Sequence, residues 1–128
     1  MFRKQAVVIT NAIGQGMSKT AKDIKNSLDF WGVARTYVIQ QALFSAKWDE
    51  VPEKRRAAVA AQCKHVAAKI LSAKRVTPRL KIRALFIVMK LSQGMIDKGE
   101  RKAGRGHTAD YLHWQRNGWL EGKKPWKE

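Results

Sequence analysis

The chain has 128 residues, of which 45% are hydrophobic and 28% are charged. This length and balance are typical of one folded globular domain with its own core, and they exclude a disordered chain. Lys and Arg number 26 against 10 Asp and Glu, so the formal net charge is +16. A compact fold with this charge repels itself, and we therefore expect it to meet a polyanion or an acidic surface.

The cysteine content and the apolar runs indicate a cytoplasmic protein. Cys63 is the single cysteine, so no disulfide can form within the chain and no oxidising compartment is implied. The longest apolar run, residues 84–89, is far too short to span a bilayer. The apolar stretch near the N-terminus is too brief and too quickly polar for a signal peptide.

The first elements are harder to assign than the later ones. Residues 6–9 fit either a buried strand or a short helix, because a run this short shows no decisive period. After two glycines, Ser18 is a suitable N-cap for a helix over residues 18–27. A further helix is predicted over residues 29–46, from apolar positions at helical spacing. These positions are Phe30, Val33, Ala34, Tyr37, Gln41 and Phe44.

Two prolines open the two longest predicted helices. Pro52 begins a helix that extends to about residue 73, and Pro78 begins another that ends with Gly99 just beyond its last turn. The second of these helices is apolar on two faces, which predicts a central position in a helical bundle. One face consists of Leu80, Ala84, Ile87, Val88, Leu91 and Met95, and the other of Ile82, Leu85, Met89 and Ile96.

The C-terminal part has a different character. Residues 100–106 predict a loop, Thr108 caps a short helix through about residue 116, and residues 117–126 are irregular and rich in tryptophan. We therefore predict an all-α protein, a compact bundle of four to five helices with an irregular Trp-rich tail. A short N-terminal strand remains an alternative. The expected division is a bundle over residues 1–106, with residues 107–128 packed on it or extending from it.

Residues 54–96 contain eleven basic side chains and no acidic one. Ordinary solvated helices mix both signs, because opposite charges four residues apart stabilise them. This segment lacks that support, which favours a binding role for its cations. They are Lys54, Arg55, Arg56, Lys64, Lys69, Lys74, Arg75, Arg79, Lys81, Arg83 and Lys90.

Within this segment, one stripe of the helix after Pro78 is a candidate phosphate-binding surface. Arg79, Arg83 and Lys90 fall on one side of that helix with Phe86 among them, and Lys74 and Arg75 precede it. Cations with an interleaved aromatic suit phosphate contacts and base stacking. In the alternative interpretation, Phe86 belongs to the core and the cations are only solvated.

A second candidate set lies near the C-terminus, where tryptophans alternate with cations. Trp and Arg are enriched at binding hot spots, and both stack on bases. Alternatively, the aromatic side chains dock the tail onto the bundle. The candidate binding residues of this set are Arg101, Lys102, Arg105, Trp119, Lys123, Lys124 and Trp126.

Catalytic, metal and cofactor sites find little support. Residues 14–20 follow an apolar run as a phosphate-binding loop does, but Ser18 and Ile13 stand where the Walker pattern needs glycine. Cys63 and His65 lie on different faces of one predicted helix, and no cluster has the spacing of metal ligands. We therefore expect no catalytic residue, no metal and no cofactor.

Two functions remain. The first is a non-enzymatic nucleic-acid-binding protein, for DNA or RNA, that holds phosphates through its basic helix stripe. The alternative is a small regulatory or inhibitory protein that binds an acidic surface of a partner protein. A homo-oligomer is compatible with either function, because the two apolar faces of the helix after Pro78 can be buried within one chain or against another copy.

Overall fold

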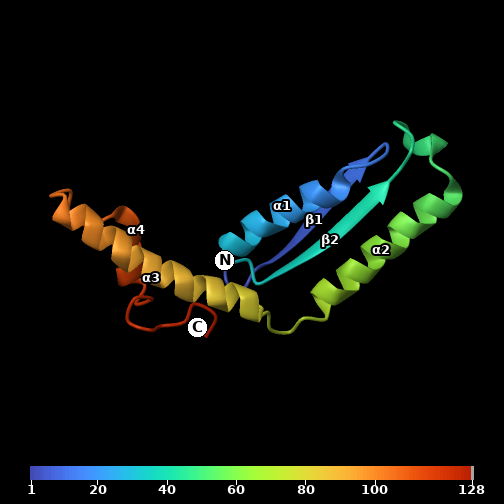
Figure 1. Cartoon of the computed structure of the whole chain (residues 1–128). Helices are drawn as coiled ribbons and strands as arrows, with labels where there is room; N and C mark the ends of the chain where they lie inside the picture. The colour runs from blue at the N-terminus through green and yellow to red at the C-terminus, as the bar shows by residue number, and fades with distance from the viewer. Residues whose placement is uncertain (128) are drawn as a thin grey trace.

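The computed structural model describes residues 1–127 and shows a mixed α/β fold, so the prediction of an all-α bundle is wrong. Strands β1 (Gln5–Ala12) and β2 (Arg35–Ala42) pair in parallel and are connected by helix α1 (Met17–Phe30). A short 3-10 turn, Trp48–Glu50, precedes helix α2 (Glu53–Leu71). Helices α3 (Leu80–Lys102) and α4 (Ala109–Arg116) follow, and helices dominate the described part of the chain (Figure 1).

The predicted helix over residues 29–46 is wrong, because α1 ends at Phe30 and residues 35–42 form β2. The apolar residues of this stretch match a helical period, but four of its central residues, 36–39, are β-branched or aromatic and favour a strand. The same preference explains β1. Residues 5–10, for which strand and helix were both open, belong to this strand. The register pairs Gln5 with Arg35 and Ala12 with Ala42.

Gly32 makes the sharp change from α1 to β2 possible. Its φ of +77° lies in the left-handed region that glycine tolerates best. A Cβ atom at this position would meet the Phe2 ring at 2.5 Å. The close approach of Phe2 therefore also requires a residue without a side chain.

The two strands lie between α1 and α2, which cover opposite faces of the sheet (Figure 1). On the α1 face, the Gln40 amide contacts the Ser18 hydroxyl, while on the α2 face the Gln41 amide donates to the Gln62 side chain. Coverage of both faces is usual for parallel sheets. The buried apolar side chains of this part are Val8, Ala21, Val33, Ala34 and Ile39.

The helix boundaries confirm some capping signals and correct others. The proline-initiated α2 and the Thr108-capped α4 are confirmed, and the Thr108 hydroxyl accepts the Tyr111 N–H at 3.1 Å. Ser18 is not the cap of α1, because Gly16 occupies that position without a side-chain hydrogen bond. Gly99 does not end α3, which continues to Lys102.

Helix α3 is not the centre of a bundle. It extends away from the sheet, and α4 and the C-terminal tail pack along it (Figure 1). Helices α1 and α2, which were expected to pack around α3, instead cover the two faces of the sheet. No helix within residues 1–127 has the length and apolarity needed to cross a membrane.

Candidate interaction surface

An aromatic cluster around Phe86 joins α3 to the tail and to the N-terminus. The Phe86 ring stacks on Trp114 at 4.9 Å between centroids and meets the edges of Phe2 and Trp126, each at 5.3 Å. Trp119 lies 5.9 Å from the same ring. Phe86 is only 6% exposed, so its ring faces are occupied by other side chains of this protein.

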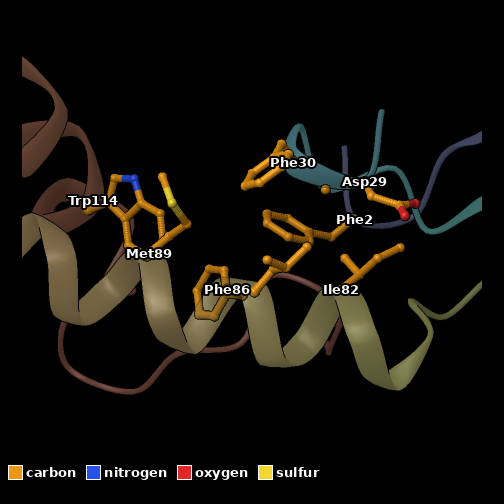
Figure 2. Close-up of a pocket in the computed structure, with 9 residues that line it drawn as sticks. Phe2, Asp29, Phe30, Ile82, Phe86, Met89 and Trp114 are labelled. Atoms are coloured by element: carbon orange, nitrogen blue, oxygen red, sulfur yellow. The ribbon is translucent and has the colours of Figure 1, made fainter. Parts of the chain in front are cut away.

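A small cavity lies beside this cluster, between the end of α1 and α3 (Figure 2). It holds about 60 Å³ and is lined mainly by apolar groups, including Phe2, Phe30 and Met89. Ligand pockets usually hold about 300–1,000 Å³. The cavity is therefore a packing defect at a joint between elements, too small for a ligand site.

Asp29 connects the end of α1 to the start of α3. Its buried carboxylate accepts hydrogen bonds from Lys81 at 2.9 Å and from Lys25 at 3.1 Å. Burial alone would raise the pKa of Asp29, but the hydrogen bonds and charges of the two lysines outweigh it and lower that pKa. The carboxylate is therefore held ionised as a structural ion pair.

Asp97 forms a second buried connection, between α3 and the start of α4. Its carboxylate is 1% exposed and accepts the Thr108 N–H and the Arg101 Nε–H, each at 3.1 Å, with His107 Nδ1 at 3.0 Å. Burial would raise the pKa of Asp97, but the Thr108 and His107 contacts, with Arg101, lower it below its ordinary value.

The face of α3 that points away from these contacts is apolar and exposed. Five of its side chains fall within about 100° of one another around the helix axis. Leu80 is 80% exposed, Leu91 63% and Met95 76%. We call this surface the α3 apolar stripe, and it consists of Leu80, Ile87, Val88, Leu91 and Met95.

Cations border the α3 apolar stripe on the side of the C-terminal tail. Arg83 and Lys90 lie along this border, where a cleft of about 340 Å³ opens between α3 and the tail. Its lining is largely apolar, and it includes no carboxylate from residues 1–127. The lining residues are Leu80, Arg83, Phe86, Ile87, Lys90, Trp119, Gly122, Lys123, Lys124, Trp126 and Lys127.

A second cleft, which we call the corner cleft, lies where the chain passes from α2 to α3. It holds about 390 Å³ and brings together cations from β2, α2 and the connecting segment. None of the described residues that line this cleft is acidic, so its lining carries a positive charge. Its lining residues are Arg35, Tyr37, Lys69, Ser72, Ala73, Arg75 and Arg79.

The structure thus divides the predicted site residues among three places. Arg75 and Arg79 line the corner cleft, with Lys74 beside Arg75 in the connecting segment. The second place is the cleft between α3 and the tail, which takes seven of the predicted residues. These are Arg83, Phe86, Lys90, Trp119, Lys123, Lys124 and Trp126.

The third place is the far end of α3, more than about 30 Å along the helix from Arg79. Arg101 bonds to Asp97 there, Lys102 is the last residue of α3, and Arg105 makes a two-point ion pair with Glu100. The Arg105 hydrogen bond lowers the pKa of Glu100, and Glu100 raises that of Arg105. These three cations therefore do not form one surface with the two clefts.

Sequence reasoning missed two features of these surfaces. Arg35 joins the corner cleft because it begins β2, and this was hidden by the prediction of a helix there. The α3 apolar stripe was recognised as an apolar face but was expected to be buried. The stripe is exposed because α1 and α2 cover the sheet and do not pack on this face of α3. A local sequence pattern does not show which helices will pack on one another.

Comparisons with protein-family models, with curated proteins and with solved structures found no match to this chain.

Proposed function

We propose that this chain is a non-enzymatic binding protein whose α3 apolar stripe and adjoining cleft dock onto an acidic protein partner. The observation that supports this proposal is the exposure of Leu80, Leu91 and Met95 beside Arg83 and Lys90. Contiguous exposed apolar surface with a polar rim is typical of protein interaction sites. The single cysteine and the high positive charge suit association in the cytoplasm with a partner of opposite charge.

A protein partner explains the apolar stripe better than nucleic acid does. Phosphates and sugars reward cations and hydrogen-bond donors, whereas aliphatic side chains gain little from them. Base stacking on the basic stripe of α3 would need an open Phe86 ring, and this ring is enclosed by Phe2, Trp114 and Trp126. A concave cleft of about 340 Å³ also suits a protruding side chain of a partner better than a flat lipid surface.

The test uses three fluorescent probes of different chemistry at several salt concentrations. They are a glutamate-rich amphipathic helical peptide with leucine at every third or fourth position, a single-stranded RNA and a duplex DNA. The double variant Leu91→Ser/Met95→Ser should weaken binding of the peptide at least about tenfold, since each apolar side chain buried at an interface contributes about 1.5–3 kcal/mol. Binding is followed by fluorescence anisotropy.

Two matched comparisons make this test specific. Ile96→Ser removes another exposed apolar side chain of α3 on a different face of the helix, and it should leave peptide binding unchanged. Lys90→Glu and Lys64→Glu make the same change of charge beside the stripe and on α2, and only the first should weaken binding strongly. Equal effects of Ile96→Ser and of the stripe variant would contradict the proposal.

Nucleic-acid binding is the second candidate, and the corner cleft favours it. Arg35, Lys69, Arg75 and Arg79 converge there without a carboxylate among the lining residues. In that case Arg75→Ala/Arg79→Ala should weaken RNA and DNA alike and lower the salt slope by about 1–2, while Leu91→Ser/Met95→Ser has no effect. That pattern would support the nucleic-acid function in place of the acidic partner.

A further inference from the structure

The outer edge of β1 is an unpaired sheet edge. Within residues 1–127 the sheet consists of β1 and β2 alone, so each strand has one edge without a neighbouring strand. Parallel sheets are normally flanked by further strands and buried on both faces. A row of unpaired backbone N–H and C=O groups is a template for pairing with another chain.

The hydrogen-bond pattern identifies which residues of β1 face this edge. The Leu43 N–H donates to the Ala12 carbonyl at 2.9 Å, continuing the ladder between the two strands. Because backbone groups alternate along a strand, even-numbered residues of β1 point their N–H and C=O groups toward β2. The odd-numbered residues Val7, Ile9 and Asn11 therefore direct theirs to the free edge.

The two free edges of the sheet differ in their protection. On β2 the Ala42 carbonyl accepts a hydrogen bond from Arg55 of α2 at 2.8 Å, so a side chain occupies part of that edge. On β1, Val7 is 39% exposed and Ile9 69% exposed. Natural edge strands are usually protected by charge, proline or a covering element, and residues 5–12 of β1 contain no charged residue or proline.

Troughs that are lined in part by apolar side chains lie beside β1 on both faces of the sheet. On the α1 face, Met17 and Ile24 of α1 overhang the end of β1 and line a cleft of about 410 Å³ with it. On the α2 face, Trp48 and Val59 line a cleft of about 240 Å³ with Ile9. A strand added beside β1 would place alternate side chains into these two troughs.

We propose that the free edge of β1 binds a β-strand, apolar on both faces, that belongs to an acidic polypeptide. Main-chain hydrogen bonds to Val7 and Ile9 supply affinity, and the troughs select apolar side chains. The net charge of +16 argues against a second copy of this chain, because two such molecules repel each other, and it favours a partner of negative charge. This site lies apart from the α3 apolar stripe and does not depend on it.

The test uses the full chain and a synthetic peptide of alternating valine and isoleucine with two glutamates at each end. Amide hydrogen exchange is measured residue by residue. In the free chain the Val7 and Ile9 amides should exchange fast while the Val8 amide is protected, and the peptide should protect Val7 and Ile9. The same peptide with N-methyl groups on alternate residues should bind at least tenfold more weakly, because it lacks the donors that complete the ladder.

Variants of the two sheet edges give a matched pair. Val7→Pro removes an N–H that faces the free edge without touching the ladder to β2, and it should weaken the peptide at least tenfold. Gln40→Pro makes the same change on the opposite edge, on β2, and should not weaken it. Leu91→Ser/Met95→Ser should also bind the peptide normally, which separates this site from the α3 apolar stripe.

Several results would overturn the proposal. These are absence of protection at Val7 and Ile9 with peptide up to about 1 mM, equal binding of the N-methylated peptide, or tighter binding of a lysine-flanked version. A concentration-dependent dimer that protects Val7 and Ile9 without any peptide would assign the edge to a second copy instead. Normal binding by Val7→Pro would show that the peptide lies elsewhere.

Discussion

Two buried aspartates illustrate how this basic chain uses its few carboxylates. Asp29 holds α1 to α3 through Lys81, and Asp97 holds α3 to the start of α4 through Arg101, His107 and the Thr108 backbone. In each case the surrounding donors outweigh burial and lower the pKa of the aspartate. These two buried aspartates therefore lie at joints between elements and stabilise the positions of α1, α3 and α4.

Asp97→Asn should lower the thermal midpoint and reduce its dependence on acid pH. A carboxyl whose pKa is lower in the folded state stabilises the fold fully above its unfolded pKa of about 3.9, and this contribution is lost as pH falls through the folded pKa. The thermal midpoint of the wild type should therefore decrease when the pH is lowered below about 4. The thermal midpoint of the variant should decrease less over the same pH range. Thermal unfolding by circular dichroism between pH 2 and pH 7 measures both.

Asp23→Asn is the matched control for this experiment. Asp23 is exposed on α1, and its side chain makes no hydrogen bond or ion pair to another described residue. Its replacement should leave both the midpoint and the pH profile close to those of the wild type. If Asp97→Asn and Asp23→Asn behaved alike, the buried carboxylate would not be the connection between α3 and α4.

At the scale of elements, the sequence predicted helices well where local signals define their ends. Pro52 and Thr108 correctly marked the starts of α2 and α4, because a fixed φ and a side-chain cap act locally. The helix predicted over residues 29–46 failed because an apolar helical period was given more weight than β-branched and aromatic residues. Parallel pairing of β1 and β2 is a long-range contact, and no local pattern reports it.

Helix α3 depends on one aromatic side chain for its position. Phe86→Ala should destabilise the fold by about 3–5 kcal/mol, the usual cost of removing a buried phenylalanine. Because Trp114 and Trp126 pack against this ring, their fluorescence should also shift to longer wavelength in the folded variant. Urea unfolding followed by fluorescence and by circular dichroism measures the loss.

Ile87→Ala is the control, since Ile87 is the next residue of α3 and is 57% exposed. Its effect on unfolding should be below about 1 kcal/mol, as is usual for exposed positions. Similar losses for Phe86→Ala and Ile87→Ala would mean that α3 is buried equally on both faces. That result would contradict the exposed α3 apolar stripe as well as the aromatic cluster.

At the scale of the whole molecule, the proposed acidic partner rests on two features together, the positive charge and the exposed apolar surface. The α3 apolar stripe, the corner cleft and the free edge of β1 lie on different elements. Among the described residues, no carboxylate lines either cationic cleft. The net charge follows from composition, and it directed the binding-site prediction to the basic segment of residues 54–96, which stays a prediction. The three surfaces could not be predicted from the sequence, because they are the parts of the molecule that stay exposed after α1 and α2 have covered the sheet.

The excess positive charge should make the stability of the isolated protein depend on salt. At about 0.1 M salt charges are screened beyond about 10 Å, and at 1 M beyond about 3 Å, so repulsion among 26 basic side chains weakens as salt rises. Sodium chloride should therefore raise the thermal midpoint, by about 4 °C for each 1 kcal/mol of repulsion removed.

Sulfate at equal ionic strength should raise the thermal midpoint further if the corner cleft holds a divalent anion, because binding to the folded state adds stability. Arg75→Ala/Arg79→Ala removes two cations of that cleft and should reduce the difference between the two salts to the general stabilising effect of sulfate, while keeping the response to chloride. A midpoint that is flat in chloride would mean that the cations are already compensated within the fold, and the case for an acidic partner would then rest on the exposed apolar surface alone.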